Sequence, residues 1–264
     1  MNATLTRTIR FCLLPDGLEP DQGRFNAFAG FPSMQGIGAY QEFDALFSGP
    51  IQQPDGLVAN TSMIDQELRE RVLPILQAAY RENPTQDPID LVPGISDVLV
   101  GTFGKSLKKI CWRLTPYYCI SMELGMTDTT LISQVFDFAA SHRLHADGLT
   151  DEQNQALFGK CNNPNSHGHN YRLEVTVEVG SGRGDFSLLQ LEKTVKECVI
   201  DRFDHMNLNL DTMEFSNQIP TVENIAMTCF KLLDEPVQAL GAKMRAAKVW
   251  ESERTSATYP AYPC

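Results

Sequence analysis

Basic residues are scarce in this sequence of 264 residues, which has 22 lysines and arginines against 33 aspartates and glutamates. The net charge of −11 argues against a protein that binds nucleic acid, because such proteins use lysine and arginine to neutralise phosphates. No run approaches the roughly 18 consecutive apolar residues of a membrane-spanning helix. Residues 1–17 also lack the apolar core and small-residue cleavage site of a signal peptide. We therefore expect a cytoplasmic protein that contacts neither nucleic acid nor a membrane.

Histidine is also scarce, and its five copies all lie in the second half, at positions 142, 145, 167, 169 and 205. This distribution excludes a histidine metal site from the first half. Cysteine occurs seven times without a regular spacing, and an odd, scattered set without a secretion signal predicts reduced thiols. Most are expected to be small core residues, whereas Cys161 lies in the polar segment "GKCNNPNSHGH".

One pattern occurs twice along the chain. Residues 36–48 ("GIGAYQEFDALFS") and 167–179 ("HGHNYRLEVTVEV") each place a tyrosine before an alternating, strand-like run, and Tyr40 and Tyr171 lie 131 positions apart. Strand-like runs precede these segments, at residues 4–14 and 129–141. Helix-like segments follow, at residues 62–80 and 95–109 in the first half and at residues 191–203 and 220–233 in the second. Apolar strands come last, at residues 117–123 and 244–252, and Pro74 is expected to kink or shorten the first helix.

This repeated order of strand, strand, helix, helix, strand, strand predicts a tandem duplication of one α+β unit. The joint is expected at residues 124–130, which gives domains at 1–124 and 130–264. The two copies have diverged, because Gly36 and Gly38 stand where the second copy has His167 and His169. The first copy is therefore expected to lack metal ligands, and any chemistry is expected in the second.

The histidines of the second copy have the spacing of a metal site. His167 and His169 are two residues apart in a predicted strand, so their side chains point to the same face. His142 ends the neighbouring strand-like run, and three neutral imidazoles with an open fourth position form a catalytic zinc arrangement. Such a histidine pair taken alone is also typical of polar surface. His145, three residues after His142, is expected to face away as a loop histidine.

Cys161 and the Asp204–His205 pair are candidates for proton transfer. A thiol works as a base or nucleophile only as the thiolate, which a nearby cation or metal favours. The spacing leaves three roles open for Cys161: a reactive thiol, a fourth zinc ligand, or a loop thiol without a role. Asp204 precedes His205, and a carboxylate can orient an imidazole as a general acid or base, although a polar helix end has the same composition.

Three further residues are candidates for binding a substrate. Thr221 is the expected N-cap of the helix at residues 220–233, and Glu223 lies in its first turn, where the helix dipole alone explains a carboxylate. Glu251 ends the apolar strand at residues 244–252. A carboxylate there either binds the N–H donors of a flat heterocycle or lies on the surface at the strand end.

Five stretches occur in order between residues 132 and 255: "FDFAASHRLH", "LTDEQNQALFGKCNNPNSHGHNYRLEVTVEV", "FDHMNLNLD", "PTVENIA" and "VWES". Together they resemble the 6-pyruvoyl-tetrahydropterin synthase family, and the first half resembles the same unit much more weakly. The resemblance implies the tunnelling fold, in which α+β units with a four-stranded antiparallel sheet and two helices on one face assemble into a barrel.

It also implies three groups of functional residues. The zinc ligands would be His142, His167 and His169. The proton-transfer group would be Cys161, Asp204 and His205. The pterin ring would be held by Glu251, assisted by Thr221 and Glu223.

The activity that the resemblance implies is conversion of 7,8-dihydroneopterin triphosphate to 6-pyruvoyl-tetrahydropterin with elimination of triphosphate. A sister branch makes 6-carboxy-tetrahydropterin for queuosine synthesis from the same substrate and typically has three residues between the cysteine and His-Gly-His. Here five residues, "NNPNS", separate Cys161 from His167, which favours the first product. A zinc hydrolase and a non-catalytic pterin-binding or assembly protein are the rival functions. The tandem arrangement predicts a homo-oligomer of three chains, in which the first copy takes the place of one subunit.

Overall fold

The chain forms two compact units, Met1–Ile132 and Ser133–Cys264, in a computed structural model that describes residues 2–20, 28–124, 129–180 and 186–261. Most of the joint expected at residues 124–130 lies outside the described residues. The roles assigned to domains 1–124 and 130–264 remain predictions.

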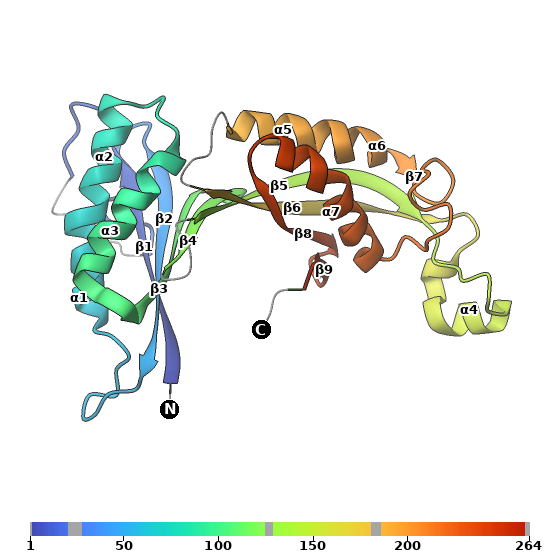
Figure 1. Ribbon diagram of the computed structural model, residues 1–264, viewed down its shortest axis with the longest axis horizontal. Helices are drawn as coiled ribbons and strands as arrows, with labels where there is room; N and C mark the ends of the chain where they lie inside the picture. Colours follow the sequence, from blue (N-terminus) through green and yellow to red (C-terminus); the bar gives the residue numbers. More distant parts are fainter. Residues whose placement is uncertain (1, 21–27, 125–128, 181–185, 262–264) are drawn as a thin grey trace. The chain divides into compact units, whose positions relative to one another are not determined.

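Unit 1 is a four-stranded antiparallel sheet with its helices on one face (Figure 1). Its strands, adjacent in chain order, are β1 (Asn2–Leu13), β2 (Ala39–Pro50), β3 (Leu107–Thr115) and β4 (Tyr118–Glu123). Its helices are α1 (Thr61–Glu67), α2 (Leu73–Glu82) and α3 (Val92–Phe103), with a π-helical turn (Leu68–Val72) and 3-10 turns (Pro88–Leu91 and Gly104–Ser106).

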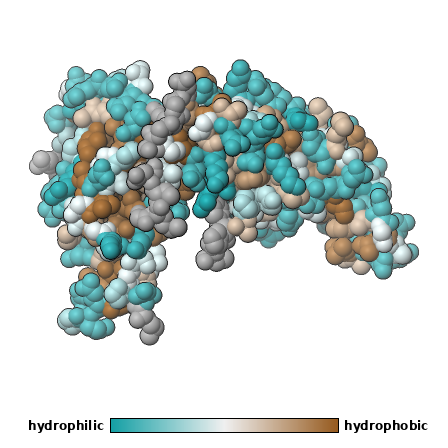
Figure 2. Space-filling view, in the orientation of Figure 1, coloured by the Kyte–Doolittle hydropathy of each residue, from teal (hydrophilic) through white to brown (hydrophobic). Residues whose placement is uncertain are grey.

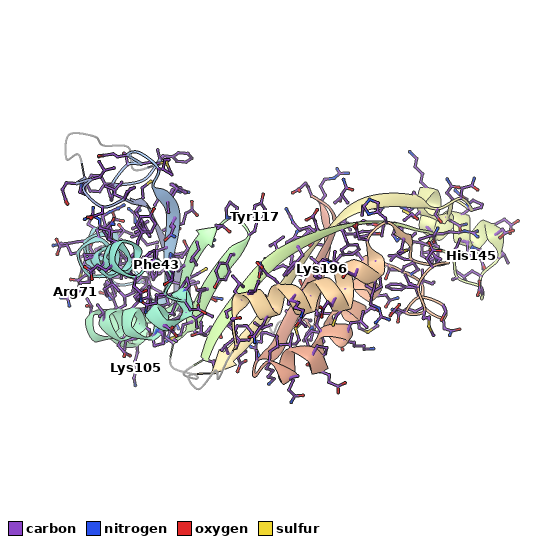
Figure 3. The ribbon with its side chains drawn as sticks, turned by 90° about the horizontal axis from the view of Figure 1, so that it is seen from above. Phe43, Arg71, Lys105, Tyr117, His145 and Lys196 are labelled. Carbon is purple, nitrogen blue, oxygen red and sulfur yellow. The ribbon has the colours of Figure 1, made fainter. Side chains whose placement is uncertain are left out.

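Alternation along β2 separates the core of unit 1 from a polar face. Phe43 and Phe47 are buried against the helices, where Phe47 meets Phe103 edge to face with ring centroids 5.1 Å apart. Figure 3 shows Phe43 inside the unit while Arg71 and Lys105 point outward. Because side chains alternate along a strand, the opposite face of the same sheet carries the polar side chains of the strands.

The helical segment of residues 61–82 is interrupted where Pro74 was expected to disturb it. The π-helical turn Leu68–Val72 lies directly before α2, and Pro74 occupies its first turn. Proline has no N–H to donate to the preceding turn, so a widened ladder accommodates it. Unit 2 has a π-helical turn, Lys196–Ile200, at the matching place without a proline. The interruption therefore has a cause beyond Pro74 alone.

The helix expected at residues 95–109 was placed wrongly at its C-terminal end. Helix α3 ends at Phe103, because Gly104 takes a positive φ of 55° that stops the helix. Leu107–Thr115 instead forms β3, in which Ile110 and Trp112 are buried against the helices.

Unit 2 has the same order of main elements. Its sheet runs β5 (Thr129–His142), β6 (His167–Gly180), β8 (Lys243–Ser252) and β9 (Thr255–Tyr259), with the short β7 (Met206–Asn207) parallel to the end of β5. Its helices are α4 (Asp151–Phe158), α5 (Leu188–Val195), α6 (Asp201–Phe203) and α7 (Val222–Ala239), with a 3-10 turn (Gly159–Asn162) before β6. The predicted α+β class is confirmed. None of the helices in the described ranges is both long enough and apolar enough to cross a membrane.

Helix α4 was not predicted, although its start has a sequence signal. The Thr150 side chain accepts a hydrogen bond from the backbone of Gln153, whose own side chain accepts one from the backbone of Thr150. Apolar residues gather over α4 on the surface (Figure 2), where Leu157 is 65% exposed.

The two units share one order of elements, but Tyr40 and Tyr171 do not occupy equivalent positions in their sheets. Tyr171 is fully buried on the helical side of its sheet, whereas Tyr40 is 38% exposed. Gln41, the next residue, is the buried one in β2. The descent of both units from one ancestor remains a prediction.

Candidate metal and catalytic site

Three histidines converge at one end of the sheet in unit 2. His142 is the last residue of β5, and His167 and His169 lie at the start of the adjacent β6. The Nε2 atoms of His142 and His167 are 3.2 Å apart, and ring centroids of the three histidines lie 4.6 to 5.2 Å from one another. Their ligand atoms and a carboxylate oxygen of Glu251 all lie within 4.8 Å of one another.

His142 is held in the orientation that a metal ligand needs. Its side chain is fully buried, and its Nδ1 lies 2.7 Å from the carbonyl oxygen of Pro220, to which it donates its proton. The lone pair of Nε2 therefore points toward the other two histidines. Donation of the second ring N–H to a backbone carbonyl is the usual way to fix a metal-binding imidazole.

The chemistry of this group fits a metal ion. Burial lowers the pKa of His167 and of His169, so both imidazoles are neutral at physiological pH. Among the residues that the structure describes, His167 Nδ1 and His169 Nε2 are buried and have no hydrogen-bond partner. Two nitrogens bound to a tetrahedral ion with bonds of about 2.0–2.1 Å lie about 3.3 Å apart, close to the separation between His142 and His167.

Glu251 belongs to the same group. Its carboxylate lies 3.2 Å from His142 Nε2 and 3.3 Å from His169 Nε2. The contact with His142, followed by the positive charge that the histidines carry when protonated, lowers the pKa of Glu251 against the effect of burial. The β6–β8 register, in which Arg172 faces Trp250, carries Glu251 to this end of the sheet. A ligand beside the histidines is therefore within reach of this carboxylate.

Cys161 lies in the 3-10 turn before β6 and is half-buried. Its carbonyl oxygen accepts a hydrogen bond of 2.8 Å from the backbone N–H of Leu144, two residues beyond His142. Burial, and then the carboxylate of Glu251, raise the pKa of the thiol. In the described part of the chain, Cys161 is not a member of the four-residue ligand group, which argues for a role beside the ion rather than on it.

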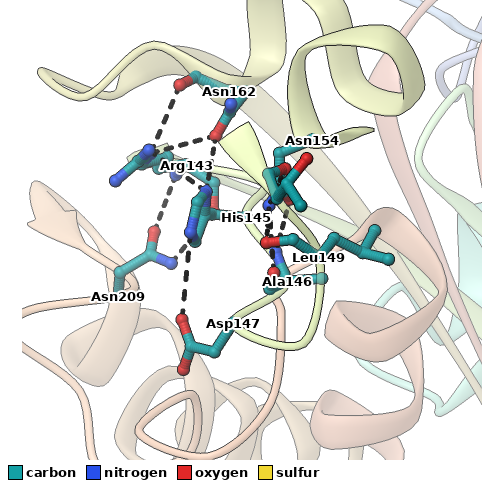
Figure 4. Close-up of polar contacts among 9 residues, drawn as sticks. Arg143, His145, Ala146, Asp147, Leu149, Asn154, Asn162 and Asn209 are labelled. Atoms are coloured by element: carbon teal, nitrogen blue, oxygen red, sulfur yellow. Dashed lines mark hydrogen bonds and ion pairs between the residues drawn. The ribbon is translucent and has the colours of Figure 1, made fainter. Parts of the chain in front are cut away.

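A polar network, missed in the sequence, fastens the loop that carries Cys161 to the end of β5 (Figure 4). Arg143 Nε donates at 3.2 Å to both the carbonyl and the side-chain oxygen of Asn162, and His145 Nδ1 lies 3.0 Å from that side-chain oxygen. Asn209 holds both backbone groups of Arg143, at 2.7 and 3.0 Å. His145 is thus a loop residue that positions Asn162.

Asn154, in α4, secures the segment that joins β5 to α4. It is fully buried, and its amide exchanges hydrogen bonds of 2.8 and 3.0 Å with the backbone of Ala146 while also donating to the carbonyls of Leu149 and Thr150. Beside this loop lies a cavity of about 560 Å³ lined by Arg143 and His145 among other residues. The contacts of Arg143 with Asn162 and Asn209 join residues 19 and 66 positions apart, so only their polar character was visible beforehand.

Asp204 and His205 form an oriented pair at the edge of the sheet. Asp204 accepts a hydrogen bond of 2.8 Å from the backbone of Ala139, and its other oxygen lies 2.8 Å from His205 Nδ1. These contacts hold the pKa of Asp204 below its usual range. His205 is 83% exposed and takes a positive φ of 61°, a strained conformation that recurs at functional sites. His205 and His169 line one open cavity of about 380 Å³.

Thr221 and Glu223 lie where α7 begins. The side chain of Thr221 accepts a hydrogen bond from the backbone of Asn224 and caps the helix, as predicted. Glu223 lies in the first turn. Pro220, which fixes His142, immediately precedes this cap, so the start of α7 is next to the histidine group.

Gly36 and Gly38, which the 131-residue sequence offset sets against His167 and His169, do not tolerate a larger side chain. A side chain at position 38 would come within 2.7 Å of the backbone oxygen of Leu13, and Gly36 has a positive φ of 60°. Backbone atoms cannot yield as a side chain can, so Gly38 cannot be exchanged for histidine without moving β1.

An α+β unit with three imidazoles, a carboxylate, a thiol and an aspartate–histidine pair at one end of its sheet has the composition of a metal-dependent acid–base enzyme. The sequence model described as 6-pyruvoyl tetrahydropterin synthase matches residues 131–261. The human 6-pyruvoyl tetrahydrobiopterin synthase is 39% identical over 131 residues, which cover 48% of this chain and 89% of the human protein. The Dictyostelium discoideum enzyme of that name is 33% identical over 51% of this chain and 98% of its own length. The chain belongs to the 6-pyruvoyl tetrahydropterin synthase family.

Two solved structures of proteins with the synthase name are also similar to this chain. The Caenorhabditis elegans 6-pyruvoyl tetrahydropterin synthase is 32% identical, with a TM-score of 0.47 over 52% of this chain and 98% of that one. The Plasmodium falciparum protein of the same name is 16% identical, with a TM-score of 0.36 over 50% of this chain and 97% of that one. Family membership confirms the resemblance inferred from the sequence for residues 131–261, together with the tunnelling-fold class, whereas the weaker resemblance of the first half stays a prediction.

Proposed function

We propose that unit 2 is a zinc-dependent pterin synthase that converts 7,8-dihydroneopterin triphosphate to 6-pyruvoyl-tetrahydropterin and releases triphosphate. The convergence of His142, His167 and His169, in a family whose relatives bear the synthase name, is the observation that carries this proposal. The five residues between Cys161 and His167 favour this product over 6-carboxy-tetrahydropterin.

The three histidines would hold the zinc ion. When bound, zinc would supply Lewis-acid stabilisation of negative charge on side-chain oxygens of the substrate. His142, fixed by Pro220, would keep its Nε2 aimed at the ion throughout the reaction.

The protein groups would move the protons. Cys161, tethered to Leu144 beside His142, would take a proton from a carbon of the substrate side chain. His205, oriented by Asp204, would return a proton from a different direction. No external reductant is needed, because the reduced pterin ring supplies the electrons by internal redistribution.

Glu251 would anchor the pterin ring. Its ionised carboxylate can accept hydrogen bonds from N–H donors of a flat heterocycle, and its position beside His142 and His169 would place that ring next to the ion. Thr221 and Glu223, at the start of α7, would assist from the side of Pro220.

The Cys161→Ala variant is expected to keep its zinc and lose turnover by about 10²–10⁴-fold, the usual contribution of a general acid or base. The measurements are zinc content of the dialysed protein and mass analysis of the product made from 7,8-dihydroneopterin triphosphate. Cys198→Ala, at a half-buried thiol on the π-helical turn, is the matched control and should retain activity. Loss of zinc from Cys161→Ala would instead make the thiol a ligand, and release of a 6-carboxy product would assign the sister activity.

We also propose that three chains assemble, so that six units close one barrel and three of them are active. Both units share one order of elements, and β1 and β9 each pair on one side only within the described ranges. An unpaired strand edge is a natural site for pairing with another copy. Light scattering is expected to give three times the chain mass of 29.5 kDa, and a monomer would contradict the proposal.

A further inference from the structure

Two cysteines lie side by side on the polar face of unit 1, the unit that does not carry the histidine group. Cys111 is in β3 and Cys119 is in β4, and the register pairs Cys111 with Ser121 and Arg113 with Cys119. Residues two apart on a strand share a face, as do directly opposed residues of neighbouring strands. The two thiols are therefore diagonal neighbours on one face.

That face is the one that the helices leave uncovered. Ile110, Trp112 and Ile120, which alternate with the cysteines, are buried against the helices. Cys111 and Cys119 are half-buried, in contrast to Cys12 and Cys229, which are fully buried. Small reagents can reach the first two thiols and not the last two.

The two thiols touch, and they are not equivalent. The Cys119 thiol donates a hydrogen bond to the sulfur of Cys111, and this contact, followed by the positive charges of Arg113 and Lys109, holds the pKa of Cys111 below its usual range despite burial. The same contact raises the pKa of Cys119. In a reactive dithiol, one thiolate attacks a disulfide and the second thiol then resolves the mixed disulfide. A pair with one stabilised thiolate and one protonated neighbour fits these two roles.

The residues around the two cysteines fix a positive charge beside the sulfurs, and the β3–β4 pairing is irregular next to them. Arg113 forms an ion pair with Asp44, the residue opposite Cys111 in β2, so its guanidinium is fixed beside the sulfurs. The β3–β4 register shifts between Arg113 and Thr115, next to the pair. Such an irregularity lets a strand bend, which diagonal cysteines require to reach the geometry of a disulfide.

We propose that Cys111 and Cys119 are a redox-active dithiol that low-molecular-weight disulfides oxidise to an intramolecular disulfide. The Cys111 thiolate attacks one sulfur of glutathione disulfide, which forms a mixed disulfide and releases one glutathione thiolate. Cys119 then loses its proton to solvent and attacks the Cys111 sulfur, releasing the second glutathione. The protein loses two electrons and two protons, and glutathione disulfide is reduced to two glutathione molecules. This modification is independent of the function proposed for unit 2.

The test treats the full-length native protein with glutathione disulfide, blocks remaining thiols, and digests it with trypsin. Cleavage after Lys109, Arg113 and Arg143 puts the two cysteines into separate peptides, residues 110–113 and 114–143. The expected product is one species in which these peptides are joined by a bond that a reductant cleaves. Peptides that stay unlinked, or that carry only stable glutathione adducts, would overturn the proposal.

Single variants separate the two roles. Cys119→Ser is expected to accumulate a glutathione adduct on Cys111, because nothing remains to displace it. Arg113→Gln is expected to slow the reaction of Cys111 about tenfold, the effect of a one-unit rise in thiol pKa. Cys198→Ser, another half-buried thiol, is the matched control and should leave the linked peptide unchanged. Equal reactivity of Cys111 and Cys198 in the native protein would contradict the proposal without requiring any variant to fold.

Discussion

Alanine in place of His167 is expected to abolish zinc binding and turnover together. The imidazole Nε2 lies 3.2 Å from that of His142, and the variant would leave two of the three proposed histidine ligands. Loss of a residue that merely orients a ligand costs about 10–100-fold in metal affinity, so loss of a ligand itself should exceed 10²-fold. Zinc content after dialysis and turnover of 7,8-dihydroneopterin triphosphate measure the two effects. A chelator should inactivate the native protein, and added zinc should restore it.

The matched control is His145→Ala. His145 lies three residues beyond His142 and contacts Asn162 instead of the histidine group. Its replacement should leave zinc stoichiometry unchanged and affect turnover only through the loop that carries Cys161. The metal assignment is wrong if His167→Ala retains one zinc per chain, or if His145→Ala loses zinc to the same extent. Normal zinc content with no turnover of this substrate by the native protein would instead favour the non-catalytic binding function.

Local sequence patterns were sufficient to predict most of the helices and strands. Alternation identified the strands at residues 129–141 and 167–179, and Thr221 was identified as an N-cap because Pro-Thr before an apolar-periodic run is a local signal. The histidine spacing likewise needed only the two-residue period of a strand. The error at residues 95–109 arose because helix-like spacing continues past Gly104, whose backbone conformation ends the helix.

The rest of the site depends on contacts between distant segments. Glu251 reaches the histidines only because Arg172 faces Trp250 in the β6–β8 register, and one residue of slippage would turn it to the other face. The contacts of Arg143 with Asn162 and Asn209 close loops of 19 and 66 residues. No local pattern specifies which of many asparagines meets this arginine.

Asp204→Asn is expected to lower kcat by about 10²–10⁴-fold while zinc content and fold are unchanged. Asparagine keeps an oxygen that can accept the backbone N–H of Ala139, so the local structure should survive. Its amide nitrogen would face Nδ1 of His205, which would accept a hydrogen bond from the amide instead of donating one to the carboxylate as in the native pair. The imidazole would have to carry its proton on Nε2, the wrong tautomer for the proposed transfer. Steady-state kinetics and thermal unfolding separate this effect from a structural one.

Asp201→Asn is the matched control, because Asp201 is an exposed carboxylate whose ion pair with Lys196 lies away from Ala139. His205→Asn removes the imidazole with a residue that tolerates a positive φ, so its effect on kcat should equal that of Asp204→Asn without added backbone strain. Two residues that act as one unit are not additive, and the double variant should be no slower than either single one. Full activity of Asp204→Asn would show that Asp204 does not assist the proton transfer, and additive losses in the double variant would show that Asp204 and His205 do not act as one unit.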